Sequence, residues 1–218
     1  ASESTNYQSI SMKAFGTWCR VSCICLVTMV SAACGNAEKG WTEGERAIID
    51  NADSLLRVLT VDSEEDLAVL RTVCTDLSED ELASDRYDRL CELLINTVTS
   101  PEQDGVGISG PQVGISRNVV AVQRFDKEGE PFEVYPNISI VTARGDMTLS
   151  SEGCLSVPGK RGKVPRFTSV DVRYRTAAGK DTVETIQGFT AIIFQHECDH
   201  LAGKLHTDCA VEVSDDER

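Results

Sequence analysis

The chain has 218 residues, enough for one domain with a full hydrophobic core and an additional segment. Lys and Arg number 21 against 35 Asp and Glu, which gives a formal net charge of -14. A chain this acidic repels phosphate backbones, so its composition argues against direct binding of nucleic acid. The acidic clusters at residues 64–66 and 215–217 are expected to be solvated surface.

The nine cysteines lack the paired spacing of a disulfide framework. Four of them lie close together near the N-terminus, and the other five are scattered along the remaining chain. Disulfide scaffolds belong to short domains with small cores, and this chain is long enough to bury a large one. Each cysteine therefore needs its own explanation.

The first 40 residues have the pattern of a leader rather than of a folded domain. Lys13 and Arg20 precede an uncharged apolar run over residues 21–33, which is shorter than the roughly 20 residues of a transmembrane helix. Such a run before small residues and Cys34 resembles a secretory signal, or a bacterial lipoprotein leader with Cys34 as the lipid acceptor. The alternatives are an apolar N-terminal helix or an extended start of the chain. We expect membrane anchoring or export, with a cytoplasmic location as the alternative.

Residues 41–210 are predicted to form the folded domain, followed by an acidic tail over residues 211–218. A helix is predicted over residues 84–98, where apolar side chains recur at intervals of three and four residues. A second helical stripe runs over residues 189–200, and Gly203 is suited to end that helix.

The segments between the two helices have the pattern of strands. Residues 119–122 and 132–135 flank a turn and predict a hairpin. Residues 170–175 alternate apolar and polar side chains, which is typical of a half-exposed strand, and a turn leads from them to a further strand over residues 182–186. The predicted fold class is α+β, with antiparallel β-sheets packed around a central, metal-binding C-terminal helix.

The strongest chemical signal is the segment Gln-His-Glu-Cys-Asp-His at residues 195–200. His196 and His200 are four residues apart, so both imidazoles lie on one face of a helix and can reach one metal ion. Glu197 can then accept a proton from an attacking water. The alternative is a pair of packed or surface histidines, and His206 is not needed for the motif. The pattern indicates a metal hydrolase without identifying its substrate.

A third ligand is predicted at Cys154, which follows Gly153 in the segment Ser-Glu-Gly-Cys-Leu-Ser. Glycine lets the backbone approach a ligand closely. One thiolate and two imidazoles, with a fourth position open, form a reasonable catalytic site. This donor set suits iron(II), zinc, cobalt or nickel. The alternative for Cys154 is a buried structural thiol.

Three motifs in fixed order resemble those of the peptide deformylases: a GxGxAAxQ loop at residues 105–112, EGCLS at 152–156 and HExDH at 196–200. The second and third match fully. The first keeps its glycines and glutamine but has Ser109 and Gly110 in place of two alanines, which is expected to make the loop more polar and more flexible.

The resemblance implies the substrate, the metal and the roles of individual residues. Formylated peptide N-termini would be hydrolysed to release formate, with one divalent metal, iron(II) being favoured, held by Cys154, His196 and His200. Glu197 would act as general base and then as general acid. The Gln112 side-chain amide and the Leu155 backbone N–H would stabilise the developing oxyanion.

A small formyl group and a methionine side chain require a narrow mouth and an apolar pocket. The residues expected to bind substrate are Val106, Gly107, Gly153, Arg161, Phe189, Ile192 and Ile193. Three of these precede His196 on the helix, and Arg161 resembles a family position near the peptide backbone. The alternatives are ordinary helix packing for the apolar residues and an exposed arginine without such a task.

Two other functions also fit parts of this sequence. A metallopeptidase of the His-Glu-x-x-His class would take a third ligand after the helix, where Glu212 and Glu217 are available. A non-catalytic binding protein of the same fold would have lost a ligand or the base, and none is lost. An exported form would process formylated peptides outside the cytoplasm, although such chains are made inside it.

Overall fold

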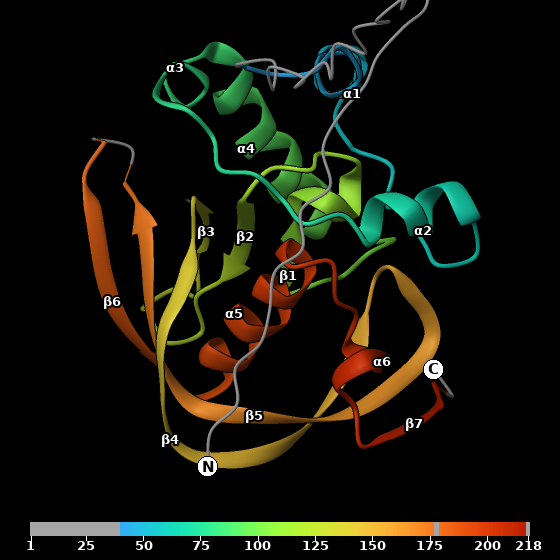
Figure 1. The fold of residues 1–218 in the computed structure, drawn as a ribbon, viewed down its shortest axis with the longest axis vertical. Helices are drawn as coiled ribbons and strands as arrows, with labels where there is room; N and C mark the ends of the chain where they lie inside the picture. The colour runs from blue at the N-terminus through green and yellow to red at the C-terminus, as the bar shows by residue number, and fades with distance from the viewer. Residues whose placement is uncertain (1–39, 177–178, 217–218) are drawn as a thin grey trace, which may run out of the picture. The chain divides into compact units, whose positions relative to one another are not determined.

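A computed structural model describes residues 40–176 and 179–216 (Figure 1). The helices are α1 (Glu43–Asn51), α2 (Glu64–Leu70), α3 (Glu79–Leu82), α4 (Asp85–Val98), the 3-10 helix η1 (Gly110–Val113), α5 (Gly188–Leu201) and α6 (His206–Cys209). The strands are β1 (Gly107–Ser109), β2 (Val119–Gln123), β3 (Phe132–Pro136), β4 (Ser139–Cys154), β5 (Val157–Arg175), β6 (Asp181–Gln187) and β7 (Glu212–Asp215). The predicted leader, with Cys34, lies outside the described residues. Within those residues, none of the helices has the length and hydropathy needed to cross a bilayer.

The helix predicted over residues 84–98 is confirmed as α4. Its start is fixed by Ser84, whose hydroxyl accepts a hydrogen bond from the Tyr87 backbone N–H at 3.2 Å. Leu90, Leu93 and Leu94 on the apolar face are fully buried. They pack with α1, η1 and the first sheet in one hydrophobic core.

The first sheet has the antiparallel order β1-β2-β3. Its β2–β3 pair is the predicted hairpin, with Val119 opposite Pro136 and Gln123 opposite Phe132. All of β2 up to Val122 is buried because helices cover one face of this sheet and α5 contacts it as well.

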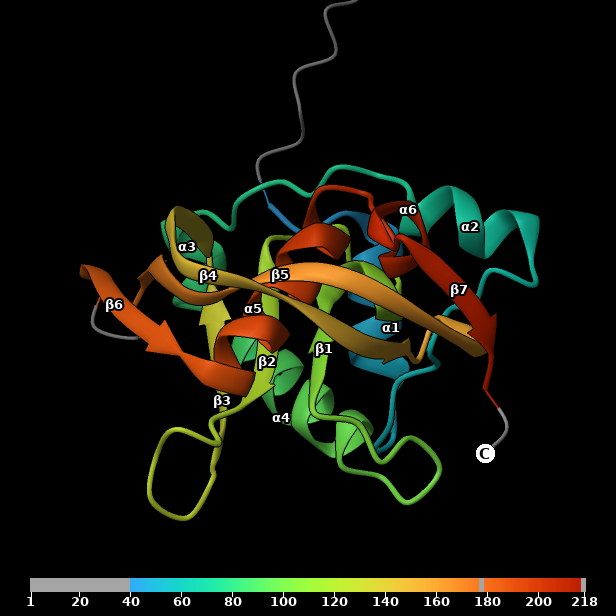
Figure 2. The same ribbon diagram turned by 90° about the horizontal axis from the view of Figure 1, so that it is seen from below.

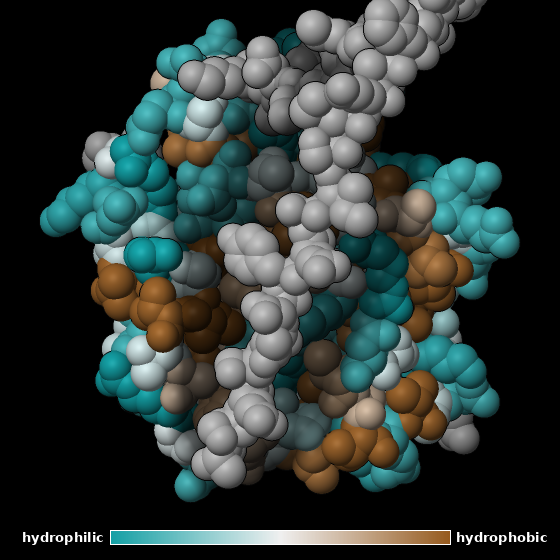
Figure 3. All heavy atoms as spheres, in the orientation of Figure 1, coloured by the Kyte–Doolittle hydropathy of each residue, from teal (hydrophilic) through white to brown (hydrophobic). Residues whose placement is uncertain are grey.

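The second sheet has the order β4-β5-β6, with β7 pairing the first half of β5. The strands predicted over residues 170–175 and 182–186 are confirmed as parts of β5 and β6. Residues 212–215, which the sequence places in an acidic tail, form β7. Much of β4 is exposed, including Met147 and Leu149. Apolar residues form several separate patches among hydrophilic ones on the face shown in Figure 3.

Helix α5 contacts strands of both sheets. Its residues Ala191, Phe194 and Leu201 are buried with side chains of β2, β5 and β6 in a second hydrophobic core. Packing on both sides leaves α5 little freedom to shift, so the side chains it carries are held in fixed positions.

Two acidic side chains expected at the surface are instead buried and paired. Asp66 is 6 % exposed and receives two hydrogen bonds of 2.7 Å from Arg57. Asp171, on the predicted polar face of its strand, is also 6 % exposed and accepts a hydrogen bond from Thr185 at 2.7 Å. Both expectations were wrong because neither an acidic cluster nor an alternating pattern reveals a cation or hydroxyl that another segment supplies.

A buried ion-pair group ties α1 to the loop before β2. Arg117 donates to both carboxylate oxygens of Glu45, at 2.8 and 2.9 Å, and its third nitrogen lies 3.1 Å from Glu81. All three side chains are at most 10 % exposed. Burial alone would raise the pKa of Glu45, but hydrogen bonds from Arg117 and Thr42 lower it below its ordinary value.

Glu45→Gln is expected to lower the free energy of unfolding at pH 7 by about 3 kcal/mol, because it removes one partner of a buried charge. The pKa of Glu45 is lower in the folded state, so this stabilisation is complete above its ordinary value of 4.5 and is lost as the pH falls. Urea unfolding at pH 7 and at pH 3.5 should therefore show a difference between wild type and variant that shrinks in acid. Glu43→Gln, at an exposed position of the same helix turn, is the matched control and should change stability by less than about 0.5 kcal/mol.

Candidate functional site

Helix α5 carries most of the candidate site and is attached firmly to β5. The Gln195 side chain accepts from the Phe167 backbone N–H at 3.0 Å and donates to the Phe167 carbonyl at 2.8 Å. This two-point bond fixes the helix beside the strand. The face of α5 that carries His196, Glu197 and His200 is thereby directed toward the end of β4.

Cys154 ends β4, where the chain turns through two residues and returns as β5 with Val157 opposite the cysteine. Its Sγ lies 3.2 Å from Nε2 of His200. Among the described residues, Cys154, His196 and His200 form a group whose ligand atoms all lie within 4.8 Å of one another. The structure therefore brings together the three predicted ligands from two distant segments.

A second layer of polar side chains holds His196 in place. Its Nδ1 lies 2.9 Å from Glu152, which also accepts two hydrogen bonds from Arg166, at 2.8 and 3.0 Å. Arg166 reaches Asp199 of α5 at 2.6 Å. Burial alone would raise the pKa of Glu152, but hydrogen bonds from His196 and Arg166 bring it down to about 2, so this carboxylate is charged.

This arrangement fits a divalent metal ion. The bond to Glu152 occupies Nδ1 of His196 and leaves Nε2 as the nitrogen that can bind metal, and a carboxylate behind a histidine is the usual support of such a ligand. Nδ1 of His200 has no hydrogen-bond partner among the described residues, and Nε2 faces the Cys154 thiol. One thiolate and two imidazoles suit zinc, iron, cobalt or nickel rather than calcium or magnesium.

Glu197 lies next to this cluster and is 3 % exposed. Burial raises the pKa of its carboxyl to about 7. Its Oε2 atom has no hydrogen-bond partner among the described residues, although the residue borders a cavity. Gly107 allows this position, because a Cβ there would stand 2.5 Å from Oε1.

Gln112, in η1, points its amide nitrogen toward the same cluster. Its carbonyl oxygen accepts from both the backbone N–H and the hydroxyl of Ser109, at 2.9 and 2.8 Å. The amide Nε2 is thereby directed to Cys154 Sγ, at 3.7 Å, and to the Ser156 hydroxyl, at 3.3 Å. The site thus contains a fixed hydrogen-bond donor beside the candidate ligands.

The two residues that depart from the family's alanines are both buried. Ser109 uses its hydroxyl internally, on Gln112. Gly110 packs so closely that a Cβ would stand 2.6 Å from the Ile115 carbonyl and 2.8 Å from that of Arg117. The serine therefore adds an internal hydrogen bond, and the glycine fits a close approach of two backbone segments.

A cavity of about 430 Å³ opens in front of the cluster. Its lining includes all the residues predicted to bind substrate, namely Val106, Gly107, Gly153, Arg161, Phe189, Ile192 and Ile193, together with Gln112, Cys154, Leu155, His196 and Glu197. Arg161 lies at the rim, where it donates to the Ser151 carbonyl at 2.9 Å. Apolar side chains from α5 and Val106, which directly precedes β1, thus share one cavity with the polar cluster.

Several residues of the site were not predicted from the sequence. Glu152 and Asp199 lie within the EGCLS and HExDH motifs, but the sequence indicates no role for either, and no local pattern distinguishes Arg166. His206, considered unnecessary for the motif, is 1 % exposed and stacks on His196 with ring centroids 6.0 Å apart. His206 begins α6, and the path of the chain after α5 brings it against His196, which the spacing of the motif does not reveal.

Glu212, the described candidate for the third ligand of a metallopeptidase, takes no part in the cluster. It lies on β7 and accepts a hydrogen bond from Lys163 at 2.7 Å. Glu217 lies outside the described residues.

Glu152→Gln is expected to weaken binding of the metal by about 10–100-fold, the usual effect of losing the partner behind a histidine ligand. The affinity for zinc, measured by competition with a chromophoric chelator, tests this expectation. Glu212→Gln removes the same charge at an exposed site and should leave the affinity unchanged. Equal affinities for all three proteins would show that Glu152 does not support His196.

Comparison with known proteins gives one consistent result. Residues 56–216 match the family described as polypeptide deformylase. A peptide deformylase from Desulforudis audaxviator is 40 % identical over 128 residues, covering 59 % of this chain and 80 % of that protein. One from Leptospira biflexa is 34 % identical over 148 residues, covering 64 % and 81 %.

Solved structures agree with these relatives. The Met-Ala-Ser-bound class I type b peptide deformylase from Acinetobacter baumannii is 35 % identical, with a TM-score of 0.63 over 71 % of this chain and 98 % of that one. The peptide deformylase from Thermotoga maritima is 27 % identical, with a TM-score of 0.64 over 73 % and 100 %. The matched region contains the entire Cys–His–His cluster and the strands that carry the cavity. The chain belongs to the polypeptide deformylase family.

Proposed function

We propose that this protein hydrolyses the N-formyl group from the N-terminal formylmethionine of nascent polypeptides and releases formate. The observation that supports this best is the position of Glu197, buried between the Cys–His–His cluster and a cavity that has apolar residues in its wall. That geometry provides a base, a candidate metal centre and a binding space within one site.

Cys154, His196 and His200 would hold one divalent metal ion. When bound, the metal supplies a Lewis acid that activates water and polarises the formyl carbonyl. Because one carboxylate oxygen of Glu197 has no hydrogen-bond partner in the described part of the chain, it can accept the proton of the attacking water and return it to the departing amine.

Charge that develops on the formyl oxygen requires fixed donors. Gln112 Nε2 is held toward Cys154 by the two bonds that Ser109 makes to its carbonyl oxygen, and the Leu155 N–H follows the cysteine directly. We assign both groups to the oxyanion. Val106, Phe189, Ile192 and Ile193 would surround the methionine side chain. Arg161 at the rim would contact the peptide backbone.

The native metal is proposed to be iron(II), with zinc, nickel and cobalt as the alternatives that the same donors accept. Metal analysis of protein purified without oxygen tests this assignment. Iron with full activity supports it, and zinc in fully active protein would replace it.

We also propose that residues 1–40 are a signal or lipid-anchor leader with Cys34 as the acceptor, because the apolar run and basic flank suit such a segment. Mass spectrometry of protein from a bacterial membrane fraction tests this idea. A lipid-modified Cys34 at the mature N-terminus supports it, and an intact, unmodified chain in the soluble fraction contradicts it.

The decisive experiment for the function is formate release from formyl-Met-Ala-Ser by the full chain purified without oxygen, with acetyl-Met-Ala-Ser as the matched control. We expect release of formate, no release of acetate, and loss of activity when a chelator removes the metal. No formate from protein that holds one metal per chain would favour the alternative of a binding protein with this fold.

A further inference from the structure

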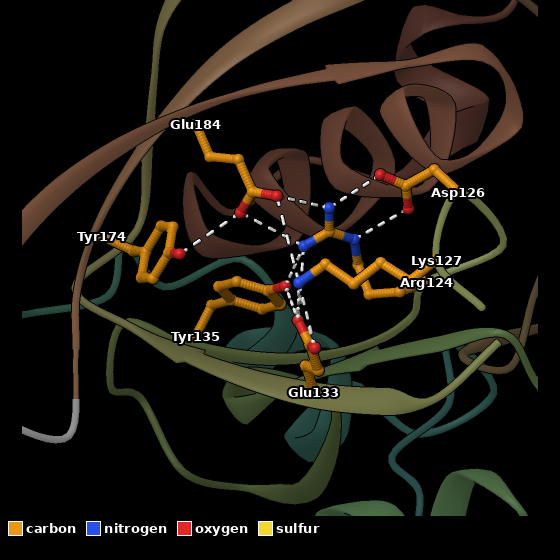
Figure 4. Close-up of polar contacts among 7 residues, drawn as sticks. All are labelled: Arg124, Asp126, Lys127, Glu133, Tyr135, Tyr174 and Glu184. Carbon is orange, nitrogen blue, oxygen red and sulfur yellow. Dashed lines mark hydrogen bonds and ion pairs between the residues drawn. The ribbon is translucent and has the colours of Figure 1, made fainter. Parts of the chain in front are cut away.

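A buried arginine outside the candidate site anchors the end of β2 (Figure 4). The Arg124 side chain is 1 % exposed and donates to three carboxylates. Two bonds of 2.8 and 2.7 Å go to Asp126, and the guanidinium also reaches Glu184 at 2.7 Å and Glu133 at 3.3 Å. These acids belong to the loop after β2, to β6 and to β3, so Arg124 links the two sheets.

The loop that follows Arg124 is therefore fixed where it begins. Figure 2 shows this connection between β2 and β3 projecting beyond both strands. Burial alone would lower the pKa of Arg124, but the hydrogen bonds that it donates to Asp126, Glu184 and Tyr135 raise it, so the guanidinium is charged. Three carboxylates around one buried cation make a directional anchor, since each bond restricts the guanidinium plane.

The same anchor reaches the first half of α5. The Arg124 guanidinium lies over the Phe194 ring, 5.8 Å from its centroid. Asp126 accepts hydrogen bonds from Arg124 and from the Thr190 side chain, which together lower the pKa of Asp126. Helix α5 has no side-chain cap of its own at Gln187, so a carboxylate at its first turn is a favourable external partner.

Phe125 lies between Arg124 and Asp126 in the sequence. Its ring packs on Phe189 of α5, with ring centroids 5.3 Å apart and planes at 51°. Phe189 lines the cavity, yet 53 % of its surface is exposed. A ring so exposed can turn away unless something supports it, and Phe125 is the aromatic ring in contact with it.

We propose that Phe125, fixed by the Arg124–Asp126 pair, is a positioning residue that sets how large a first side chain the substrate pocket accepts. It acts through Phe189 and touches no reacting atom. This inference rests on the proposed function, because the pocket is the one assigned to the methionine side chain.

The test compares formyl-Met-Ala-Ser with formyl-Phe-Ala-Ser, using formate release and, separately, calorimetric binding of the products Met-Ala-Ser and Phe-Ala-Ser. We expect Phe125→Ala to reduce the preference for methionine by at least about fivefold. Without the support of Phe125, the Phe189 ring can move and the pocket can accept a larger side chain. The change should appear in KM and in product affinity, with kcat for the methionine substrate within about twofold of wild type. Phe125→Leu, which keeps an apolar contact, should restore most of the preference.

Asp126→Asn tests the anchor without changing the pocket, and should shift the preference in the same direction by a smaller amount. Lys127→Met is the matched control from the same cluster, since the hydrogen bonds of Lys127 go to Glu133, and it should leave the preference unchanged. Thermal unfolding of each variant shows whether it is folded.

Folded Phe125→Ala and Asp126→Asn proteins with the wild-type preference in both assays would overturn the inference. Loss of preference in Lys127→Met as well would also overturn it, because the effect would then be general. If wild-type protein neither releases formate nor binds Met-Ala-Ser, the proposed function itself fails, which is a different result from an active enzyme with unchanged selectivity.

Discussion

Replacing Glu197 by glutamine is expected to lower kcat/KM for formate release by about 10²–10⁴-fold while leaving the bound metal in place. Glutamine keeps the shape of the side chain and can occupy the same position beside Gly107, where the missing Cβ leaves room for it. It cannot accept the proton of the attacking water. The measurement is formate release from formyl-Met-Ala-Ser, with metal content determined on the same sample.

The metal content distinguishes this effect from damage to the cluster. Glu152→Gln should show the opposite pattern, with weaker metal binding and nearly normal turnover for each metal-loaded molecule, because Glu152 supports His196 from behind. A Glu197→Gln variant with full activity would falsify the role of this carboxylate as the base. A variant that has lost its metal would place Glu197 in the support of the cluster instead.

The two helices predicted from the sequence, α4 and α5, were predictable because their signals are local. The apolar spacing of α4, together with Ser84 as its cap, is contained within residues 84–98 and does not depend on any distant segment. The same holds for α5, whose two histidines share a face through the helix repeat alone. For these elements, local preference and tertiary packing agree.

The long strands were only partly predictable. β4 runs from Ser139 to Cys154 with few buried residues, so it lacks the alternation that reveals a strand. Its pairing with β5 also shifts register at three places, between Ile140 and Thr142, Arg144 and Met147, and Glu152 and Cys154. The first two shifts each add one residue to β4 and so reverse the side of the sheet that the following residues face, which hides the pattern in the sequence.

The residues of the candidate site also differ in how far the sequence predicts them. Cys154 and the two histidines are found from short motifs, whereas the link from Glu152 to Arg166 depends on two strands pairing in one register. The role of Phe125 has even less sequence signal, because it follows from a ring contact between a loop and α5, 64 residues later. Motifs therefore predict the groups that react, and the fold is needed to identify those that position them.

Cys154→Ala is expected to abolish stable metal binding and to reduce formate release by about 10³-fold or more, because the metal contributes several kcal/mol of transition-state stabilisation. Two imidazoles would remain, but Cys154 is the proposed ligand on β4, and without it the proposed ligands come from α5 alone. Cys91→Ala is the matched control, since this thiol lies on α4 among core residues and should leave both metal content and activity unchanged.

Cys154→Ala also tests whether metal binding stabilises the fold. Because a ligand that binds only the folded state adds stability, wild-type protein at a metal concentration of about 1,000 times Kd gains about 4 kcal/mol. A chelator should therefore lower the Tm of wild type and of Cys91→Ala, and should have no effect on Cys154→Ala. A Cys154→Ala protein whose Tm still falls with chelator would retain a metal site without the thiolate, and the ligand set would then have to include another side chain. His206, stacked on His196, would be the first to examine.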